Sequence, residues 1–288
     1  RAKLRWNLGD ATTVLFNVDY DDFANQQAVY FRPAPGTLSN AGATSAPPPG
    51  IYDTFENLDP RADAKQYGGS VKITHDFANA LRLVSISAYR NVEATQEFAQ
   101  DGNRTARLNP LLVYSTDTYS QEFQILSDPD SAWSWVAGAF FLKDEVTVDP
   151  FLFSGTLAGG GLNRKGAFAT QETESYSAFF QTTLPLGGKG NVTAGIRYTN
   201  DDRSMTGGRE NFDATGNSLR TTAVNSGISD SWSNVTGRLS VDYQFTDDFM
   251  GYASVATGFK GGGSNPRPFN PAQVIPFNPE KVTAYELG

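Results

Sequence analysis

Residues 235–245 read VTGRLSVDYQF, and this stretch decides the fold class. Its odd-numbered positions are apolar or small, whereas its even-numbered positions include arginine, aspartate and glutamine. Successive side chains of a β-strand point to opposite faces, so the pattern predicts a strand between an apolar and a polar environment. Residues 13–20 and 192–199 alternate in the same way, and no stretch shows comparable regularity at helical spacing. The sequence therefore predicts an all-β protein.

The composition of the 288 residues argues against several classes of function. The net charge of −8 comes from 23 basic and 31 acidic residues, which disfavours a nucleic-acid partner that needs a basic surface. The absence of cysteine removes disulfide scaffolds, thiolate nucleophiles and cysteine-bound zinc together. His75 is the single histidine, which leaves little for an acid–base pair or a histidine-based metal site. The composition therefore leaves little for thiol- or histidine-based chemistry, and we single out no catalytic residue, no metal ligand and no cofactor.

The alternating stretches and their connections indicate about ten antiparallel strands and a short final one. Short turns, such as 187–190 and 246–248, alternate along the chain with long connections rich in Gly, Pro, Asn and Ser. Tight turns therefore fall at one end of the sheet and long loops at the other. The expected strands are 2–8, 12–20, 67–77, 80–93, 114–127, 132–147, 171–184, 190–203, 232–245, 249–259 and 281–288, with long loops at 21–66, 94–113, 148–170, 204–231 and 260–280.

This arrangement is typical of a transmembrane β-barrel. Many of the expected strands exceed the five or six residues usual in a soluble sheet. Tilted membrane strands joined alternately by short periplasmic turns and long extracellular loops give the same alternation of short and long connections. Aromatic residues lie at both strand ends, as expected where strands cross two membrane interfaces. The aromatic residues beside the short turns are Phe77, Trp133, Trp135, Tyr243, Phe245 and Phe249, and Tyr114 and Trp232 begin strands on the long-loop side.

A large soluble β-sandwich or β-helix is the alternative fold, because its strands alternate too. Such folds do not usually place all their long loops at one end, which favours the barrel. The lipid-facing side of residues 80–93 and 249–259 stays unassigned, because both faces of these stretches carry apolar residues. No run approaches the roughly 18 apolar residues that a membrane-spanning helix needs.

The last quarter of the chain resembles the barrel of TonB-dependent outer-membrane receptors. The similar segments are residues 231–263, which include GYASVATGFKGGG at 251–263, and residues 277–288, which read FNPEKVTAYELG. In that family a Pro-Glu segment followed by Glu-x-Gly opens a strand after the glycine-rich loop. Residues 119–123 (YSQEF) also resemble an internal barrel strand of the family.

The resemblance implies a barrel of roughly 22 strands that is plugged by an amino-terminal globular domain. We expect residues 1–288 to be part of one such barrel domain, truncated at both ends, with the plug and the motif that contacts TonB outside it. Open sheet edges leave backbone groups unpaired in lipid, so this part alone is not expected to span a bilayer. The implied location is the bacterial cell outer membrane.

By the same resemblance, the function is capture of a scarce external ligand and its import into the periplasm with energy from the TonB system. A ferric siderophore is the commonest ligand in the family, and vitamin B12, haem, oligosaccharides and plant-derived aromatics are further possibilities. The implied partners are outer-membrane lipid, the plug domain, TonB with its inner-membrane energising complex, and a small external ligand. Two other functions stay open: a passive porin, and a secreted β-rich adhesin or glycan-binding module.

The candidate contact residues fall into two groups. Polar residues of the strands at 190–203 and 232–245 should point into the lumen, where they line a ligand path or contact the plug. Aromatic residues of the proline-rich connection 21–66 are placed to stack on a ligand. The first group is Arg197, Arg238, Asp242 and Gln244, and the second is Tyr30, Phe31, Tyr52 and Phe55.

Residues 258–264 and His75 could suggest ligand sites, but we predict a structural role for both. Residues 258–264 (GFKGGGS) lack the Gly-Lys-Ser/Thr order of a phosphate-binding loop, so they predict a strand that ends in a flexible outer loop. His75 falls on the apolar face beside Ile73 and Phe77, which predicts an interfacial histidine near a short turn.

Overall fold

A computed structural model of the chain describes residues 1–25, 50, 53, 57–100, 104–128, 131, 133–158, 164–212, 215–221, 228–265 and 275–288. Within these ranges every regular element is a β-strand, and none of the described residues forms a helix able to span a membrane. The strands are β1 (Ala2–Leu8), β2 (Thr12–Asn25), β3 (Arg61–Asp76), β4 (Arg82–Glu97), β5 (Asn109–Leu126), β6 (Ser134–Ser154), β7 (Arg164–Leu186), β8 (Gly190–Phe212), β9 (Ser218–Thr221), β10 (Ile228–Thr246), β11 (Phe249–Lys260) and β12 (Glu280–Leu287).

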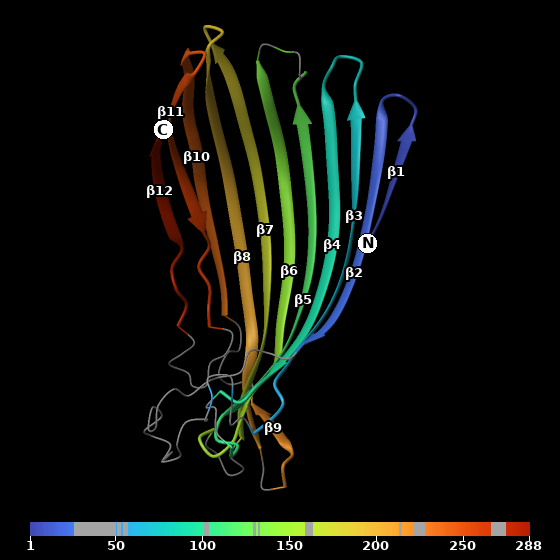
Figure 1. Ribbon diagram of the computed structural model, residues 1–288, viewed down its shortest axis with the longest axis vertical. Coiled ribbons are helices and arrows are strands. Elements are labelled where there is room, and N and C mark those ends of the chain that lie inside the picture. Colours follow the sequence, from blue (N-terminus) through green and yellow to red (C-terminus); the bar gives the residue numbers. More distant parts are fainter. Residues whose placement is uncertain are drawn as a thin grey trace.

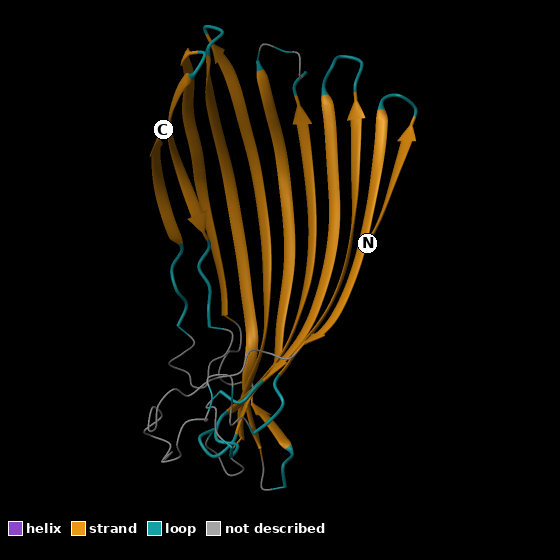
Figure 2. Ribbon diagram, viewed as in Figure 1, coloured by secondary structure: helices purple, strands orange, loops and turns teal. Residues whose placement is uncertain are grey.

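All of these strands belong to one antiparallel sheet in which each pairs with its neighbour along the chain. The order is β1-β2-β3-β4-β5-β6-β7-β8-β10-β11-β12, and the short β9 pairs only with β8. Figure 1 shows a tall, curved wall with tight turns at one end. The strand ends that the longer connections join lie at the other end. Figure 2 shows the same division between strand and loop. The predicted all-β fold and the segregation of short turns from long loops are confirmed.

The register sorts the side chains into two faces, which we call the apolar face and the polar face. Ile196 pairs with Gly237 and Arg197 pairs with Thr236, so the alternation predicted for β8 and β10 is in phase. Val18, Ile196 and Leu239 lie on the apolar face with 56%, 57% and 52% of their surface exposed. Because large aliphatic side chains are this exposed along the whole sheet, the apolar face needs a non-aqueous environment.

The register also assigns the faces of β4 and β11, which the sequence left open. In β4, Leu83 and Tyr89 lie on the apolar face, because they pair with His75 and Gly69. Ser85 and Ser87 share that face, and they hydrogen bond with Gln121 of β5, so a small polar cluster there satisfies its own donors. Apolar side chains of β4 at alternate positions lie on the polar face instead. This exchange of polar and apolar residues is why periodicity alone could not orient β4.

In β11, the register with β10 places Ala253 and Val255 on the apolar face, opposite Val241 and Leu239. Tyr252 and Ser254 lie on the polar face. The residues of β11 are mostly small or amphipathic, which explains why their periodicity was ambiguous.

Aromatic rings on the apolar face form two belts. In the loop-side belt, ring centroids are 6.2 Å apart for Tyr67 with Tyr89, 6.2 Å for Tyr119 with Phe141 and 5.0 Å for Phe141 with Tyr176. The turn-side belt includes the contacts of Trp135 with Phe180 and of Tyr243 with Phe245. Members of the loop-side belt are Tyr20, Tyr67, Tyr89, Tyr119, Phe141, Tyr176 and Tyr198, and those of the turn-side belt are Phe77, Trp133, Trp135, Phe180, Tyr243, Phe245 and Phe249.

Tyr114 and Trp232 do not contribute to these belts, although both begin expected strands on the long-loop side. Tyr114 pairs with Ala94, and Trp232 pairs with Asp201, which puts both on the polar face. Side chains on one face of a strand are separated by an even number of residues, and Tyr114 and Trp232 are each at such a separation from the polar-face residues of their own strands. His75 lies where it was expected, beside the turn-side belt, with Nδ1 2.7 Å from Thr12 Oγ1 and its ring 4.6 Å from that of Phe77.

The strands reach further toward the loops than their apolar periodicity indicates. β7 begins at Arg164 rather than at 171, and β8 ends at Phe212 rather than at 203. β9 lies inside the expected loop 204–231. Beyond the loop-side belt both faces carry polar residues, so the alternation disappears from the sequence while backbone pairing continues.

Candidate ligand-binding surface

Two predicted contact residues, Arg197 and Arg238, come together on the polar face. Arg197 pairs with Thr236 across β8 and β10, and Arg238 is two positions further along the same face. The two arginines are therefore diagonal neighbours on adjacent strands. Gly195 and Ala256 are the residues paired with Arg238 on either side, so little side-chain volume surrounds it.

Aromatic rings hold the guanidinium of Arg197. Its central carbon is 5.6 Å from the ring centre of Phe179 and 5.7 Å from that of Phe140. Its Nε donates a hydrogen bond to Thr199 Oγ1 at 3.3 Å. The ring faces attract the cation through their quadrupoles, so Arg197 leans over β7 toward β6 and away from β10.

A pocket of about 270 Å³ is lined by both arginines. Its other polar-face walls include Phe179, Gln181 and Thr236. Within the described part of the chain, no carboxylate lies within ion-pairing distance of either guanidinium. The pocket is therefore basic, and ligand contact by Arg197 and Arg238 stays a prediction.

Asp242 and Gln244 lie on the same face but outside that pocket, close to the turn between β10 and β11. Asn191 Nδ2 donates to Asp242 Oδ2 at 3.0 Å. Gln244 Nε2 donates to the carbonyl oxygens of Thr246 at 2.7 Å and Asp247 at 3.3 Å. Gln244 thus braces this turn, whereas Asp242 joins β10 to β8. Ligand contact by either side chain stays a prediction.

The loop group of candidates, Tyr30, Phe31, Tyr52 and Phe55, lies outside the described residues.

Phe140 and Phe179 also belong to this surface, although neither was among the predicted contact residues. Each is the first member of a Phe-Phe pair, at 140–141 and 179–180. Adjacent residues of a strand point to opposite faces, so such a pair must place one ring on the polar face. Phe-Phe within a strand was therefore an available signal for an aromatic residue in the lumen wall.

Two networks order the chain beyond the loop-side belt. Arg203 Nη1 donates to the carbonyl oxygen of Gly262 at 2.8 Å, which ties the segment after β11 to β8. Arg220 of β9 donates from both Nη atoms to Asp149 of β6 at 2.6 Å, and its Nε is 3.3 Å from Glu210 Oε1. Hydrogen bonding to Asp149 raises the pKa of Arg220 above its usual value, so this side chain stays charged.

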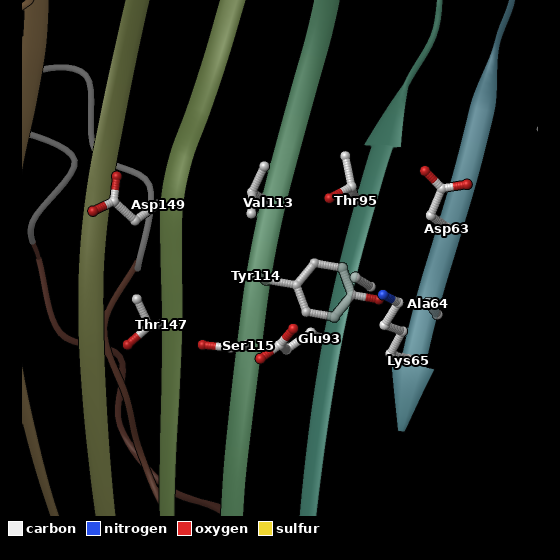
Figure 3. Close-up of a pocket in the computed structure, with 11 residues that line it drawn as sticks. Asp63, Ala64, Lys65, Glu93, Thr95, Val113, Tyr114, Ser115, Thr147 and Asp149 are labelled. Carbon is white, nitrogen blue, oxygen red and sulfur yellow. The ribbon is translucent and has the colours of Figure 1, made fainter. Parts of the chain in front are cut away.

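A second hollow, of about 330 Å³, lies on the apolar face just beyond the loop-side belt. Lys65, Glu93, Ser115 and Thr147 form one row across it, as their register shows. Figure 3 shows these side chains and their neighbours spread over four adjacent strands, and Glu93 reaches toward β5. Because Lys65 is two positions from Tyr67, the hollow opens on the same side as the aromatic belt and not into the lumen.

The described residues contain no group of three or more His, Cys, Asp or Glu side chains placed to hold a metal ion.

Comparisons with known proteins agree with this geometry. Residues 5–288 match the family model described as TonB dependent receptor-like, beta-barrel. The chain is 31% identical over 115 residues to the pesticin receptor of Yersinia pestis, a match that covers 40% of this chain and 16% of that receptor.

Among solved structures, the ferric yersiniabactin uptake receptor of Yersinia pestis aligns with a TM-score of 0.77 at 18% identity, over 99% of this chain and 41% of that one. The closed form of the ferric-catecholate import receptor of E. coli K12 aligns with a TM-score of 0.70 at 14% identity, over 99% of this chain and 47% of that one. The chain therefore spans less than half the length of these proteins.

In that family the apolar face meets lipid and the polar face lines the barrel, which accounts for the two aromatic belts and for the basic pocket between them. Given a family match over nearly its whole length, this chain belongs to the TonB-dependent receptors, bacterial outer-membrane β-barrels that serve as receptors and transporters rather than as enzymes.

Proposed function

We propose that the protein captures a ferric siderophore or a similar chelate at the loop end of its barrel and imports it into the periplasm with energy from TonB. The observation that carries the proposal is the family match over residues 5–288, together with the position of the strand ends that the long connections join, which lie at one end of the wall. The names of the similar proteins support the ligand class, since two of them are receptors for ferric chelates.

We further infer that residues 1–288 are part of one barrel domain whose lumen is filled by a plug. A barrel of roughly 22 strands would leave a wide aqueous opening unless a domain filled it. An energised step is then needed to move the plug, which is the role proposed for TonB and its inner-membrane complex. The basic pocket at Arg197 and Arg238 faces this lumen and supports a path for a negatively charged chelate.

Uptake of radiolabelled iron tests the proposal. The full-length receptor is expressed in a bacterial strain that lacks its own siderophore receptors, and ferric hydroxamate, catecholate and carboxylate chelates are supplied singly at nanomolar concentration. We expect one class to be accumulated, and accumulation to cease when TonB is deleted. Uptake that persists without TonB would indicate a passive porin. Binding of a glycan without uptake of any chelate would favour the adhesin alternative.

A further inference from the structure

We propose that the hollow beyond the loop-side belt, on β3, β4, β5 and β6, binds the headgroup of a membrane lipid that carries both a phosphate and a primary amine. Lys65 binds the phosphate and Glu93 binds the amine. The site lies on the lipid-facing side of the wall, so it is separate from the lumen and does not depend on which ligand the receptor imports.

The hollow lies at the height of the lipid headgroups. Lys65 is two residues beyond Tyr67 of the loop-side belt, which is about 7 Å along a strand. Glu93 pairs with Lys65 across β3 and β4, so it lies in the same row. Aromatic belts mark the headgroup level, and the headgroup layer is roughly 5–7 Å thick on each side of the hydrocarbon. The hollow therefore continues the lipid-facing surface into this layer.

Two rows of side chains form the walls of the hollow. The row nearer the belt is Lys65, Glu93, Ser115 and Thr147, and the row two positions nearer the loops includes Asp63 and Asp149. The residues between the rows direct their side chains to the polar face, so backbone forms the floor. Beside the hollow the register shifts in β5 and in β6, and such irregularities re-aim side chains.

Three carboxylates line the hollow, and two of them already have a cation. Asp149 accepts hydrogen bonds from Arg220 at 2.6 Å, and Asp63 Oδ2 lies 3.7 Å from Arg61 Nε. The third carboxylate belongs to Glu93, which forms no ion pair with any described residue.

Lys65 is also without an ion pair among the described residues, although it has a carboxylate directly opposite on each side. Asp22 of β2 accepts a hydrogen bond from Tyr20 at 2.9 Å instead. Glu93 of β4 reaches toward β5, on the side away from β3 (Figure 3).

Other pairs of opposite charge on this side of the wall do close across the strands. Lys143 Nζ lies 3.1 Å from Glu174 Oε1, and Arg61 Nε lies 4.0 Å from Glu97 Oε2. Both pairs stand directly opposite in the register, as Lys65 and Glu93 do. The hollow thus differs from its surroundings in holding one positive and one negative group that are both free.

A headgroup with a phosphate and an ammonium matches these two charges. A lysine ammonium binds phosphate as a point charge. Glu93 and the Ser115 hydroxyl beside it can accept hydrogen bonds from a primary ammonium, whereas a quaternary ammonium has no N–H to donate. Directly opposite residues have Cβ atoms about 4.5–5.5 Å apart, a separation that suits the short ethyl link of phosphoethanolamine. The volume of about 330 Å³ suits a headgroup rather than a whole lipid.

Native mass spectrometry of the full-length receptor in detergent tests the proposal. Phosphatidylethanolamine, phosphatidylglycerol and phosphatidylcholine with identical acyl chains are titrated singly, because they share the phosphate and differ in the group beyond it. Lys65→Gln and Glu93→Gln each remove one charge of the hollow. Lys143→Gln is the matched control, because Lys143 is likewise two residues beyond a belt ring, that of Phe141, but is already paired. Thermal unfolding establishes that each variant is folded.

We expect the wild type and Lys143→Gln to bind phosphatidylethanolamine at least about threefold more tightly than either other lipid. Lys65→Gln and Glu93→Gln should each lose this preference. Lipids bound elsewhere on the barrel are common to all variants, so the difference between variants reports the hollow.

Equal affinity of the wild type for the three lipids would overturn the proposal. A preference that survives in either Lys65→Gln or Glu93→Gln would do so too, because both charges are required. Loss of the preference in Lys143→Gln as well would show that surface charge in general, and not the hollow, selects the lipid. Neither iron nor transport enters this assay, so its outcome is independent of the uptake experiment.

Discussion

Gly262, two residues after the end of β11, lies where the chain packs closely against Phe277 and Trp232. A Cβ atom built on it would lie 2.4 Å from the carbonyl oxygen of Phe277 and 2.7 Å from the ring of Trp232. The neighbouring Gly263 and Phe277 exchange backbone hydrogen bonds of 3.2 Å and 2.8 Å. The glycine-rich run is therefore a site of close packing, whereas the sequence had predicted a flexible loop.

Replacing Gly262 by alanine should destabilise this contact by about 1–3 kcal/mol, the usual cost of overpacking. Hydrogen exchange of residues 258–265 in the full-length receptor measures the effect as faster exchange. Gly195→Ala serves as the control, because its Cβ would meet only ordinary contacts, the nearest at 3.5 Å. Unchanged protection in Gly262→Ala would contradict the packing argument.

The role of Arg220 depends on partners that are far from it in the sequence. It joins Asp149 and Glu210, of which Glu210 is only 5% exposed, and its guanidinium lies 4.7 Å from the ring centre of Phe168. Ser218 also donates to Glu210 at 2.7 Å. Removal of Arg220 would leave the buried carboxylate of Glu210 without its cationic partner.

The variant Arg220→Gln should therefore destabilise the β8–β9 hairpin by about 1–3 kcal/mol, in line with charged hydrogen bonds that are partly exposed to water. Hydrogen exchange of residues 209–212 and 218–221 would report it. Arg164→Gln provides a comparison, since Arg164 lies 4.5 Å from the ring centre of Phe212 and should contribute less. Equal effects of the two variants would argue against the role given to the Asp149 and Glu210 contacts.

At the scale of single strands, the two faces have opposite tolerance for charge. Leu239 lies on the apolar face, four residues from Val235, which pairs with Tyr198 of the loop-side belt, and four from Tyr243 of the turn-side belt. It is therefore close to the middle of the bilayer. Ser240, the next residue, faces the lumen beside Thr193.

Leu239→Arg should destabilise the folded receptor in lipid vesicles by about 2–4 kcal/mol, because a charge at the midplane of the lipid face loses its hydration. Ser240→Arg places the same side chain on the polar face and should cost much less. Urea titration of tryptophan fluorescence in vesicles compares the two. A larger loss for Ser240→Arg would reverse the assignment of the faces.

At the scale of the whole molecule, the sheet has two open edges. β1 and β12 each pair on one side only within the described structure, and every described side chain of β12 is exposed. In lipid an open edge leaves backbone donors and acceptors without partners. We therefore predict that the wall inserts into a membrane only when both edges are paired.

Residues 1–288 expressed alone should therefore fail to form a stable barrel in detergent micelles or vesicles. Heat-modifiable migration in dodecyl sulfate gels, with protease resistance as a second measure, tests this directly. The full-length receptor is the control and should show both properties. A heat-modifiable, protease-resistant product of the 288 residues alone would mean that the edges pair in some other way.

The sequence by itself determined the membrane-spanning parts of the strands other than β9, their antiparallel order and the two faces of β8 and β10. These features follow from local rules: alternation at Ile196 and Arg197 sets a face within one strand, and glycine-rich turns such as 187–190 set the hairpins. The family followed from the motifs at 231–263 and 277–288. The candidate residues Arg197 and Arg238 could be found because their faces were readable from periodicity.

Only the tertiary structure decided which residues of different strands meet. Register between strands places Phe140 and Phe179 beside Arg197, and it orients β4, whose own pattern carries serines on the lipid face. Arg220 reaches Asp149 across 71 residues of sequence. Which residues of distant strands meet depends on the register of every strand pair between them, so no local sequence pattern encodes such contacts. The extensions of β7 and β8 toward the loops also could not be predicted locally. Backbone pairing continues there, although the alternation of apolar and polar side chains has ended.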